Sequence, residues 1–108
     1  MIRKLMKALT EKDYKAMAAC FTENCKYFDY CPSLNGESNY FVYGSDCVEM
    51  FFRNRFTFDY LEVADPQFES DNAATYFGAY NGPYVYARLT IEAYGIDGLI
   101  QKVLVTPA

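Results

Sequence analysis

Apolar residues recur every three or four positions in two segments at the start of the chain. The first segment covers residues 2–9, and the second begins at Tyr14 and repeats through Phe21. This spacing places the apolar side chains on one face of a helix. Because polar residues with helix-capping side chains separate the segments, the pattern predicts two short helices that meet at a corner.

A third amphipathic segment opens at Gly44-Ser45 and continues to Phe56. Ser45 is the expected N-cap, since its hydroxyl can accept a hydrogen bond from a free backbone N–H. Glu49 and Arg53 stand four residues apart, where opposite charges on a helix attract each other. An apolar stripe runs beside them, so this is the helix that the sequence specifies best.

The other apolar segments have the length and alternation of strands. Strands are expected at residues 25–31, 40–43, 57–64, 67–70, 73–80, 84–94 and 99–106. Residues 32–39 are expected to form a loop, and Asp65-Pro66 to break a strand, because proline cannot donate to a strand ladder. Three helices packed on a curved antiparallel sheet make an α+β fold, and residues 1–108 fit a single domain.

Composition removes several classes of function. Hydrophobic residues make up 52% of the chain, which is enough for a packed core. The net charge of −4 and the absence of a Lys/Arg cluster argue against nucleic-acid binding. No apolar run approaches a membrane span, and residues 1–9 carry charges every few positions, unlike a signal peptide. No membrane association and a cytoplasmic location are therefore expected.

Histidine is absent, which excludes any imidazole base or nucleophile-histidine pair. The four cysteines are open to three interpretations, namely disulfides, metal ligands and reduced thiols. They contain no C-x-x-C pair, and a zinc site without histidine would need all four at irregular spacing. Buried reduced thiols are the preferred interpretation, with no metal and no cofactor expected.

One run carries a resemblance to a known family. The run is Phe21-Thr-Glu-Asn-Cys-Lys-Tyr-Phe-Asp29, and it follows the predicted helix pair and precedes the Gly44-Ser45 helix start. With the terminal Asp97-Gly98-Leu99-Ile100, these motifs follow the order of the nuclear transport factor 2-like superfamily, which the chain resembles in its ketosteroid isomerase and polyketide cyclase branch. The resemblance covers nearly the whole chain and implies a cone-shaped fold around a pocket. Its members include enzymes and proteins without catalysis.

The same resemblance gives Asp29 a candidate catalytic role. In ketosteroid isomerases the corresponding run ends in the aspartate that transfers the proton. Such chemistry needs a carboxylate in a largely apolar pocket and hydrogen-bond donors for the developing oxyanion. The isomerase donors, a tyrosine and an aspartate, correspond here to Leu5 and Thr90. The alternative for Asp29 is a strand-end residue that bonds nearby backbone.

The resemblance also implies which residues line a ligand pocket. They are Phe52, Phe56, Phe77, Ala79, Arg88, Thr90, Val103 and Val105. For the apolar ones, ordinary core is the alternative. In residues 84–94, alternation turns Leu89 and Ile91 inward, whereas the family register turns Thr90 inward. The family register is preferred, because a homodimer through the outer face of the sheet would bury Leu89 and Ile91 as well.

Arg88 is expected either inside the cone, paired with Asp29 or Glu92, or on a solvated strand face. Beside Asp29 it would favour the ionised carboxylate and weaken Asp29 as a base.

Two functions follow from these expectations. One is a pocket enzyme of isomerase, dehydratase or hydrolase type, with Asp29 as the base on a small apolar or aromatic molecule. The other is a non-catalytic domain of the same fold that binds a ligand or assembles as a dimer. An inward Asp29 beside a cavity, with a raised pKa, would favour catalysis, whereas an outward Asp29 or one bonded to its own loop would count against it.

Overall fold

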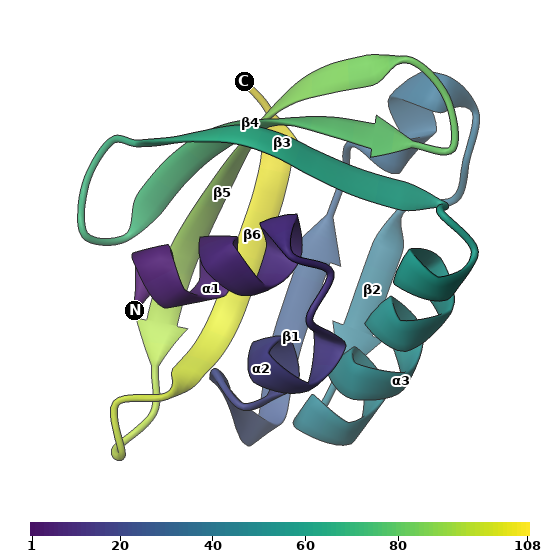
Figure 1. Cartoon of the computed structure of the whole chain (residues 1–108). Helices are drawn as coiled ribbons and strands as arrows, with labels where there is room; N and C mark the ends of the chain where they lie inside the picture. Colours follow the sequence, from purple (N-terminus) through teal and green to yellow (C-terminus); the bar gives the residue numbers. More distant parts are fainter.

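A curved sheet of six strands, in the order β2-β1-β6-β5-β4-β3, forms the frame of the molecule, and the helices pack against one face of it (Figure 1). The computed structural model describes residues 1–108. The elements in chain order are α1 Ile2–Thr10, α2 Tyr14–Ala18, β1 Phe21–Asp29, a 3-10 helix Pro32–Asn35, β2 Tyr40–Tyr43, α3 Ser45–Thr57, β3 Leu61–Phe68, β4 Ala73–Tyr80, β5 Tyr84–Tyr94 and β6 Ile100–Pro107. The expected α+β fold is confirmed.

The sheet is mixed rather than antiparallel throughout. β1 and β6 run parallel, with Asp29 opposite Val105, while the other neighbours are antiparallel. Hairpin turns explain the antiparallel pairs of β3 to β6, which follow one another in sequence. Since β1 and β6 are far apart in the chain, no turn fixes their direction, and the expectation of an antiparallel sheet is wrong at this pair.

The second helix is shorter than the sequence pattern predicts. It ends at Ala18, and Phe21 is the first residue of β1, where it pairs with Ile100. Phe21 is buried in that position. The sheet therefore buries the apolar side chain that the helical spacing assigned to the second helix. Asp13 caps the start of the helix by accepting a hydrogen bond from the Ala16 N–H at 3.0 Å.

The N-cap of α3 is Gly44, and the prediction of Ser45 is wrong. Gly44 has φ of +88°, a conformation that favours glycine, and the Ser45 side chain makes no cap hydrogen bond. The Gly44 N–H donates to the Cys25 carbonyl at 2.8 Å. This bond joins the start of α3 to β1.

The strand after α3 begins later than predicted, at Leu61, because α3 continues to Thr57. Asp65-Pro66 does not break this strand. The pairing with β4 shifts register between Ala64 and Gln67, and Asp65 has φ of +52°, so the pair forms a bulge within β3. Proline is tolerated there because β3 is an edge strand.

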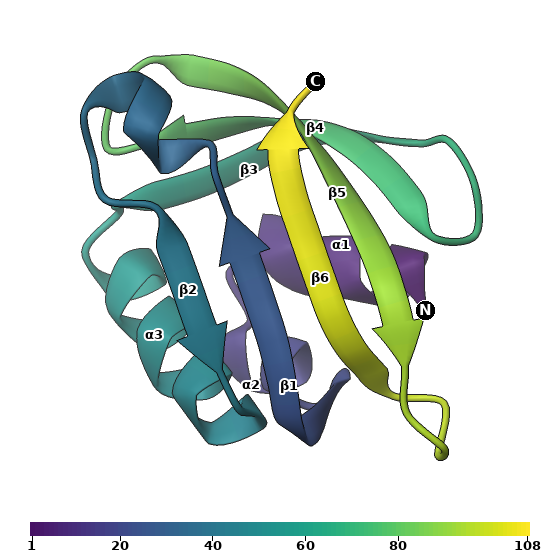
Figure 2. The same cartoon turned by 180° about the vertical axis from the view of Figure 1, so that it is seen from behind.

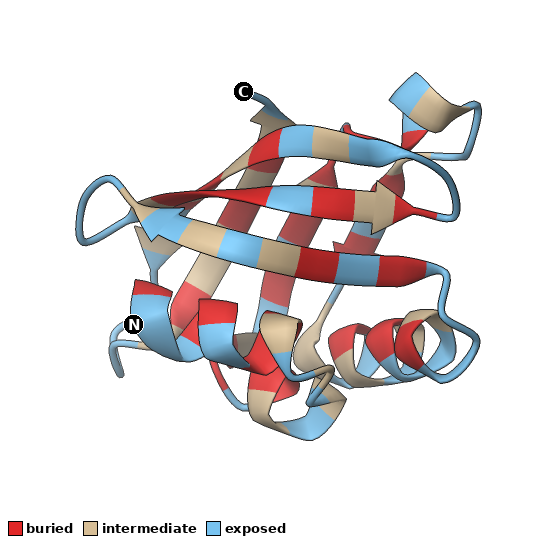
Figure 3. Cartoon of the chain, turned by 45° about the horizontal axis from the view of Figure 1, so that its top comes forward, coloured by how far each residue is buried: buried red, intermediate tan, exposed pale blue.

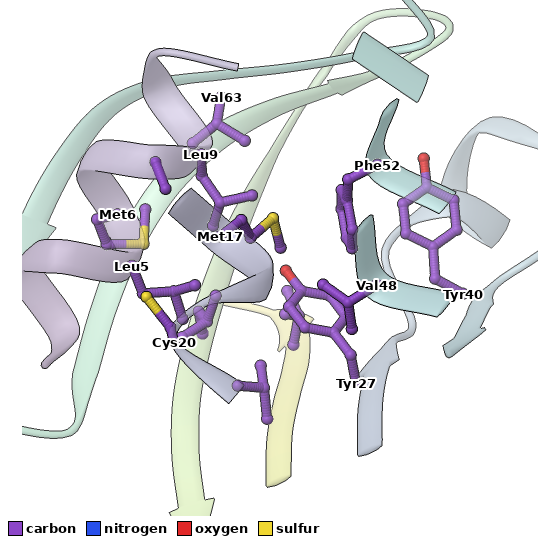
Figure 4. Close-up of a cluster of buried hydrophobic side chains, with 14 of the residues drawn as sticks. Leu5, Met6, Leu9, Met17, Cys20, Tyr27, Tyr40, Val48, Phe52 and Val63 are labelled. Atoms are coloured by element: carbon purple, nitrogen blue, oxygen red, sulfur yellow. The ribbon is translucent and has the colours of Figure 1, made fainter. Parts of the chain in front are cut away.

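Figure 3 shows buried positions on the helix faces and strand faces that meet each other. In the close-up, Leu5, Leu9 and Met17 extend from α1 and α2 toward the ring of Tyr27, on which Phe52 of α3 packs (Figure 4). Three of the four cysteines, Cys20, Cys25 and Cys31, are buried free thiols, whereas Cys47 is exposed. No helix is long and apolar enough to cross a membrane.

Candidate functional site

Asp29 ends β1 with its side chain in the interior, and it is 1% exposed. Its Oδ1 accepts the Cys31 N–H at 2.9 Å, and its Oδ2 accepts the Tyr80 hydroxyl at 2.5 Å. No cation pairs with it. The carboxylate therefore faces inward, as expected, but each of its oxygens already has a protein donor, and one of these donors belongs to the loop that follows the strand.

Two tyrosines of β4 extend this hydrogen-bond chain. The hydroxyls of Tyr76 and Tyr80 lie 2.6 Å apart and are both buried. They occupy the same face of β4 with Gly78 between them. A Cβ on Gly78 would lie 2.6 Å from Cε2 of Tyr80 and 2.9 Å from Cε2 of Tyr76. Glycine thus provides the space in which the two rings converge.

Burial dominates the electrostatics of this chain. It raises the pKa of Asp29 to about 6, although the hydrogen bonds from Tyr80 and Cys31 lower it in part. Burial raises the pKa of the Tyr76 and Tyr80 hydroxyls well above their usual range. It also raises the pKa of the Cys31 thiol to about 12, with a further contribution from the Asp29 charge. The phenols remain neutral donors at physiological pH, and only Asp29 titrates near it.

A cavity of about 360 Å³, here called the Tyr80 pocket, lies beside this chain. Its lining residues come from the loop before β2, the start of β2, the end of α3 and the segment after it, and the end of β4 with the turn that follows: Glu37, Ser38, Tyr40, Arg55, Tyr60, Tyr80 and Asn81. Asp29 is not among them. Tyr80 connects the two features, because it both lines the pocket and donates to Asp29.

Arg55 is the cationic residue of the pocket. Its guanidinium carbon lies 4.3 Å from the ring centroid of Phe51 and 5.3 Å from that of Tyr40. It donates one hydrogen bond, to Oδ1 of Asn54 at 2.6 Å, and pairs with no carboxylate. Glu37 lines the same pocket, and its Oε1 accepts the Asn81 amide at 3.1 Å.

Four of the predicted pocket residues point inward. Phe52 and Phe56 of α3, and Val103 and Val105 of β6, are all buried in the core, and Val105 lies beside Asp29 in register. None of the four lines the Tyr80 pocket. They belong to the hydrophobic core, the alternative expected for them from the sequence.

The other four predicted pocket residues, Phe77, Ala79, Arg88 and Thr90, lie on the opposite face of the sheet. Phe77 stacks on Tyr86 with ring centroids 5.0 Å apart. Arg88 pairs with Glu69 through two hydrogen bonds, at 2.7 and 3.1 Å, and not with Asp29 or Glu92.

The register preferred for β5 is therefore wrong. Leu89 and Ile91 are 0% and 4% exposed within one chain, and Thr90 points the other way. Shifting a strand by one residue reverses every side chain, so burial of Leu89 and Ile91 in the core decides the register without any partner.

The pocket residues that sequence reasoning missed are Glu37, Ser38, Tyr40, Arg55, Tyr60, Tyr80 and Asn81. One signal was available, because Tyr76 and Tyr80 share the strand face that carries the small residues Ala74 and Gly78. No group of three or more His, Cys, Asp or Glu side chains is arranged to hold a metal ion.

No family model and no curated protein matches the sequence. Solved structures of similar fold do match. An NTF2-like protein of unknown function from Cytophaga hutchinsonii is 15% identical, with a TM-score of 0.64 over 99% of this chain and 86% of that one. A hypothetical protein with a ketosteroid isomerase-like fold from Catenulispora acidiphila, in complex with trimethylamine, is 12% identical, with a TM-score of 0.66 over 99% of this chain and 84% of that one.

The yeast deubiquitinase Ubp3 and Bre5 cofactor complex also contains a similar chain, 13% identical, with a TM-score of 0.64 over 99% of this chain and 90% of that one. The chain described here has the nuclear transport factor 2-like fold. Since the same fold occurs in proteins of such different description, it does not select an activity.

Proposed function

We propose that this protein is a small-molecule-binding domain whose ligand occupies the Tyr80 pocket. The observation that carries the proposal is the cavity itself, about 360 Å³ in volume, with three tyrosines and four polar or charged residues on its walls. Ligand sites typically have volumes of roughly 300–1,000 Å³ and combine apolar walls with a few polar groups that orient the ligand. The Tyr60 ring, 42% exposed, offers most of the aromatic surface to a flat ligand, because Tyr40 and Tyr80 are 4% and 1% exposed.

Binding without catalysis is the version that the geometry favours. A general base must come within hydrogen-bond reach of the proton that it removes, about 2.6–3.2 Å between heavy atoms. Asp29 does not line the pocket, and its two oxygens are held by Cys31 and Tyr80. A substrate in the pocket as it stands therefore meets Tyr80 before it meets the carboxylate.

An enzyme of isomerase or dehydratase type is the second candidate. It is favoured by the buried Asp29, whose pKa is raised to about 6 by burial, and by its direct bond to a pocket residue. In this version the Tyr80 ring moves aside when substrate binds, and Asp29 becomes the base. One variant, Asp29→Asn, distinguishes the two candidates. If the protein is an enzyme, the variant loses turnover, and if it only binds a ligand, the variant still binds it.

A screen of flat aromatic fragments by two-dimensional amide NMR tests the binding proposal. The expected result is that fragments shift the amide signals of Ser38, Tyr40, Tyr60 and Asn81, which surround the pocket. Shifts confined to the outer face of the sheet, or no shifts at millimolar fragment, would show that the cavity is not a ligand site. Tyr86→Ala on the outer face is the matched control and leaves the pocket shifts unchanged.

We also propose that the chain forms a homodimer through the outer face of the sheet, which no helix covers (Figure 2). Phe41 and Tyr43 are 50% and 58% exposed there, and both rings pack on Phe28, with centroids 5.5 and 5.6 Å away. Exposed aromatic clusters are typical of interaction surfaces. Light scattering at micromolar concentration tests this, and a monomer would contradict it.

A further inference from the structure

We infer that the ligand of the Tyr80 pocket is a small carboxylic acid with a flat apolar body, and that its carboxylate binds Arg55. The inference rests on the proposed binding function and adds the chemical class of the ligand. It assigns to Arg55 a role that neither the fold nor the sequence resemblance suggests. Three features of the pocket support it.

The first feature is the unused hydrogen-bonding capacity of Arg55. A guanidinium has five N–H donors. Arg55 donates one to its neighbour Asn54 and also interacts with the Tyr40 hydroxyl, where it partly offsets the burial that raises the pKa of Tyr40, so most of its donors remain free. Among the ten Lys and Arg side chains, Arg88, Lys12 and Lys102 have a carboxylate partner, and the others, Arg55 among them, have none. Arg55 is thus the cation that lines the pocket and still lacks an anion.

The second feature is the way in which Arg55 is held. Its guanidinium rests against the rings of Phe51 and Tyr40, at 4.3 and 5.3 Å from their centroids. The two rings hold the group in place, and its N–H donors lie at the edge of the guanidinium plane. Because those donors form a rigid fork, they match the two oxygens of a carboxylate, and little freedom remains to be lost on binding.

The third feature is the placement of the opposite charge. Glu37 also lines the pocket, but it does not pair with Arg55, and the Asn81 amide holds its Oε1 at 3.1 Å. The pocket therefore keeps its positive and negative groups apart on different elements. For the rest of a ligand whose anion reaches Arg55, the same pocket offers the exposed ring of Tyr60 and the edge of the largely buried Tyr40.

Paired titrations with benzoate, benzamide and benzylamine test the inference, because the three share a ring and differ in charge. Amide NMR reports where each probe binds, and calorimetry reports its affinity. Benzoate is expected to bind in the pocket about tenfold more tightly than benzamide, since hydrogen bonds between charged groups are roughly twice as strong as neutral ones. Raising the salt concentration is expected to reduce the difference in affinity between benzoate and benzamide, because salt screens the charge of Arg55.

Arg55→Gln is expected to remove the preference for benzoate, and Arg55→Lys to keep part of it, because lysine retains the charge but not the fork. Arg53→Gln is the matched control, on the same helix but exposed and outside the pocket, and leaves the preference unchanged.

Several results would overturn the inference while leaving the binding proposal intact. They are equal binding of benzoate and benzamide in the pocket, tighter binding of benzylamine, and an equal loss of both ligands in Arg55→Gln, which would indicate a packing role. If no probe, charged or neutral, shifts the pocket amides, then the proposed function and the inference both fail.

Discussion

The hydroxyl of Tyr80 donates a 2.5 Å hydrogen bond to Oδ2 of Asp29, across 51 positions of sequence. The bond joins the end of β4 to the end of β1, although these strands are not neighbours in the sheet. It also brings the one interior carboxylate into contact with a wall of the pocket. A change at Tyr80 is therefore expected to affect both the stability of the interior and the shape of the pocket.

Tyr80→Phe is expected to lower the free energy of unfolding by about 1–3 kcal/mol, because it leaves a buried carboxylate oxygen without its donor. Chemical denaturation at neutral pH measures the change. Tyr86→Phe is the control, since its ring lies on the outer face and is 47% exposed. A Tyr80→Phe protein as stable as the Tyr86→Phe protein would contradict the assigned bond.

Asp29 is expected to make the protein less stable as pH rises from about 4 to about 6. Its pKa is near 3.8 ordinarily and about 6 in the folded protein, because burial disfavours the charged form. In that window the folded state binds more protons than the unfolded state, so the free energy of unfolding falls as pH rises and is level above about 6. Across this window the free energy of unfolding falls by about 3 kcal/mol at most.

The test compares the pH dependence of unfolding in the natural protein and in Asp29→Asn. The comparison is needed because other carboxylates act in the opposite direction, such as Glu69, whose pKa is lowered by its hydrogen bonds from Arg88. The difference between the two proteins is expected to slope downward between pH 4 and pH 6. A flat difference would mean that the Asp29 pKa is not raised.

Gly78→Ala is expected to break the contact between the Tyr76 and Tyr80 hydroxyls, since the added methyl would lie 2.6 Å from one ring and 2.9 Å from the other. Overpacking and the lost hydrogen bond together are expected to lower the free energy of unfolding by about 2–4 kcal/mol. Thermal unfolding measures it, with Ala79→Ser, the next position on the opposite strand face, as control. Unchanged stability in Gly78→Ala would show that the rings do not meet over this glycine.

Thiol labelling of the native protein is expected to modify one of the four cysteines quickly. Cys47 is exposed, whereas Cys20, Cys25 and Cys31 are buried, and burial raises the pKa of each of these three thiols. Since the thiolate is the reactive form, the buried three react only when the chain opens. Cys47→Ser is expected to abolish the fast phase, and a second fast thiol would contradict the assigned burial.

The sequence predicts the elements of this fold better than it predicts their partners. Helical spacing in residues 2–9 and alternation in residues 84–94 follow from local burial, and both elements form where expected. The alternation also identifies Leu89 and Ile91 as core, which the family register contradicts. A monomer core is a stronger constraint on β5 than an analogy to relatives at low identity.

The candidate site was predicted only in part, for a physical reason. The inward direction of Asp29 follows from its strand and from the resemblance, but its donor Tyr80 comes from a distant strand, and no local pattern pairs the two. Arg55 is readable in the sequence as a charge near a helix end, where it stabilises the helix dipole. Its contact with Phe51, four residues earlier on α3, is local, but its contact with the Tyr40 ring exists only after α3 has packed beside β2.

The parallel pairing of β1 with β6 has a consequence for how the chain reaches its native state. One half of the sheet is the β1-β2 hairpin and the other is the run from β3 to β6, and β6 joins them. A ribosome makes residues 100–107, which form β6, after all the other strands. The β1-β2 pair therefore has no strand to pair with on the β1 side until β6 has been synthesised. Contacts of such high contact order form slowly. We therefore expect Asp29, whose strand partner is Val105, to become buried late in folding.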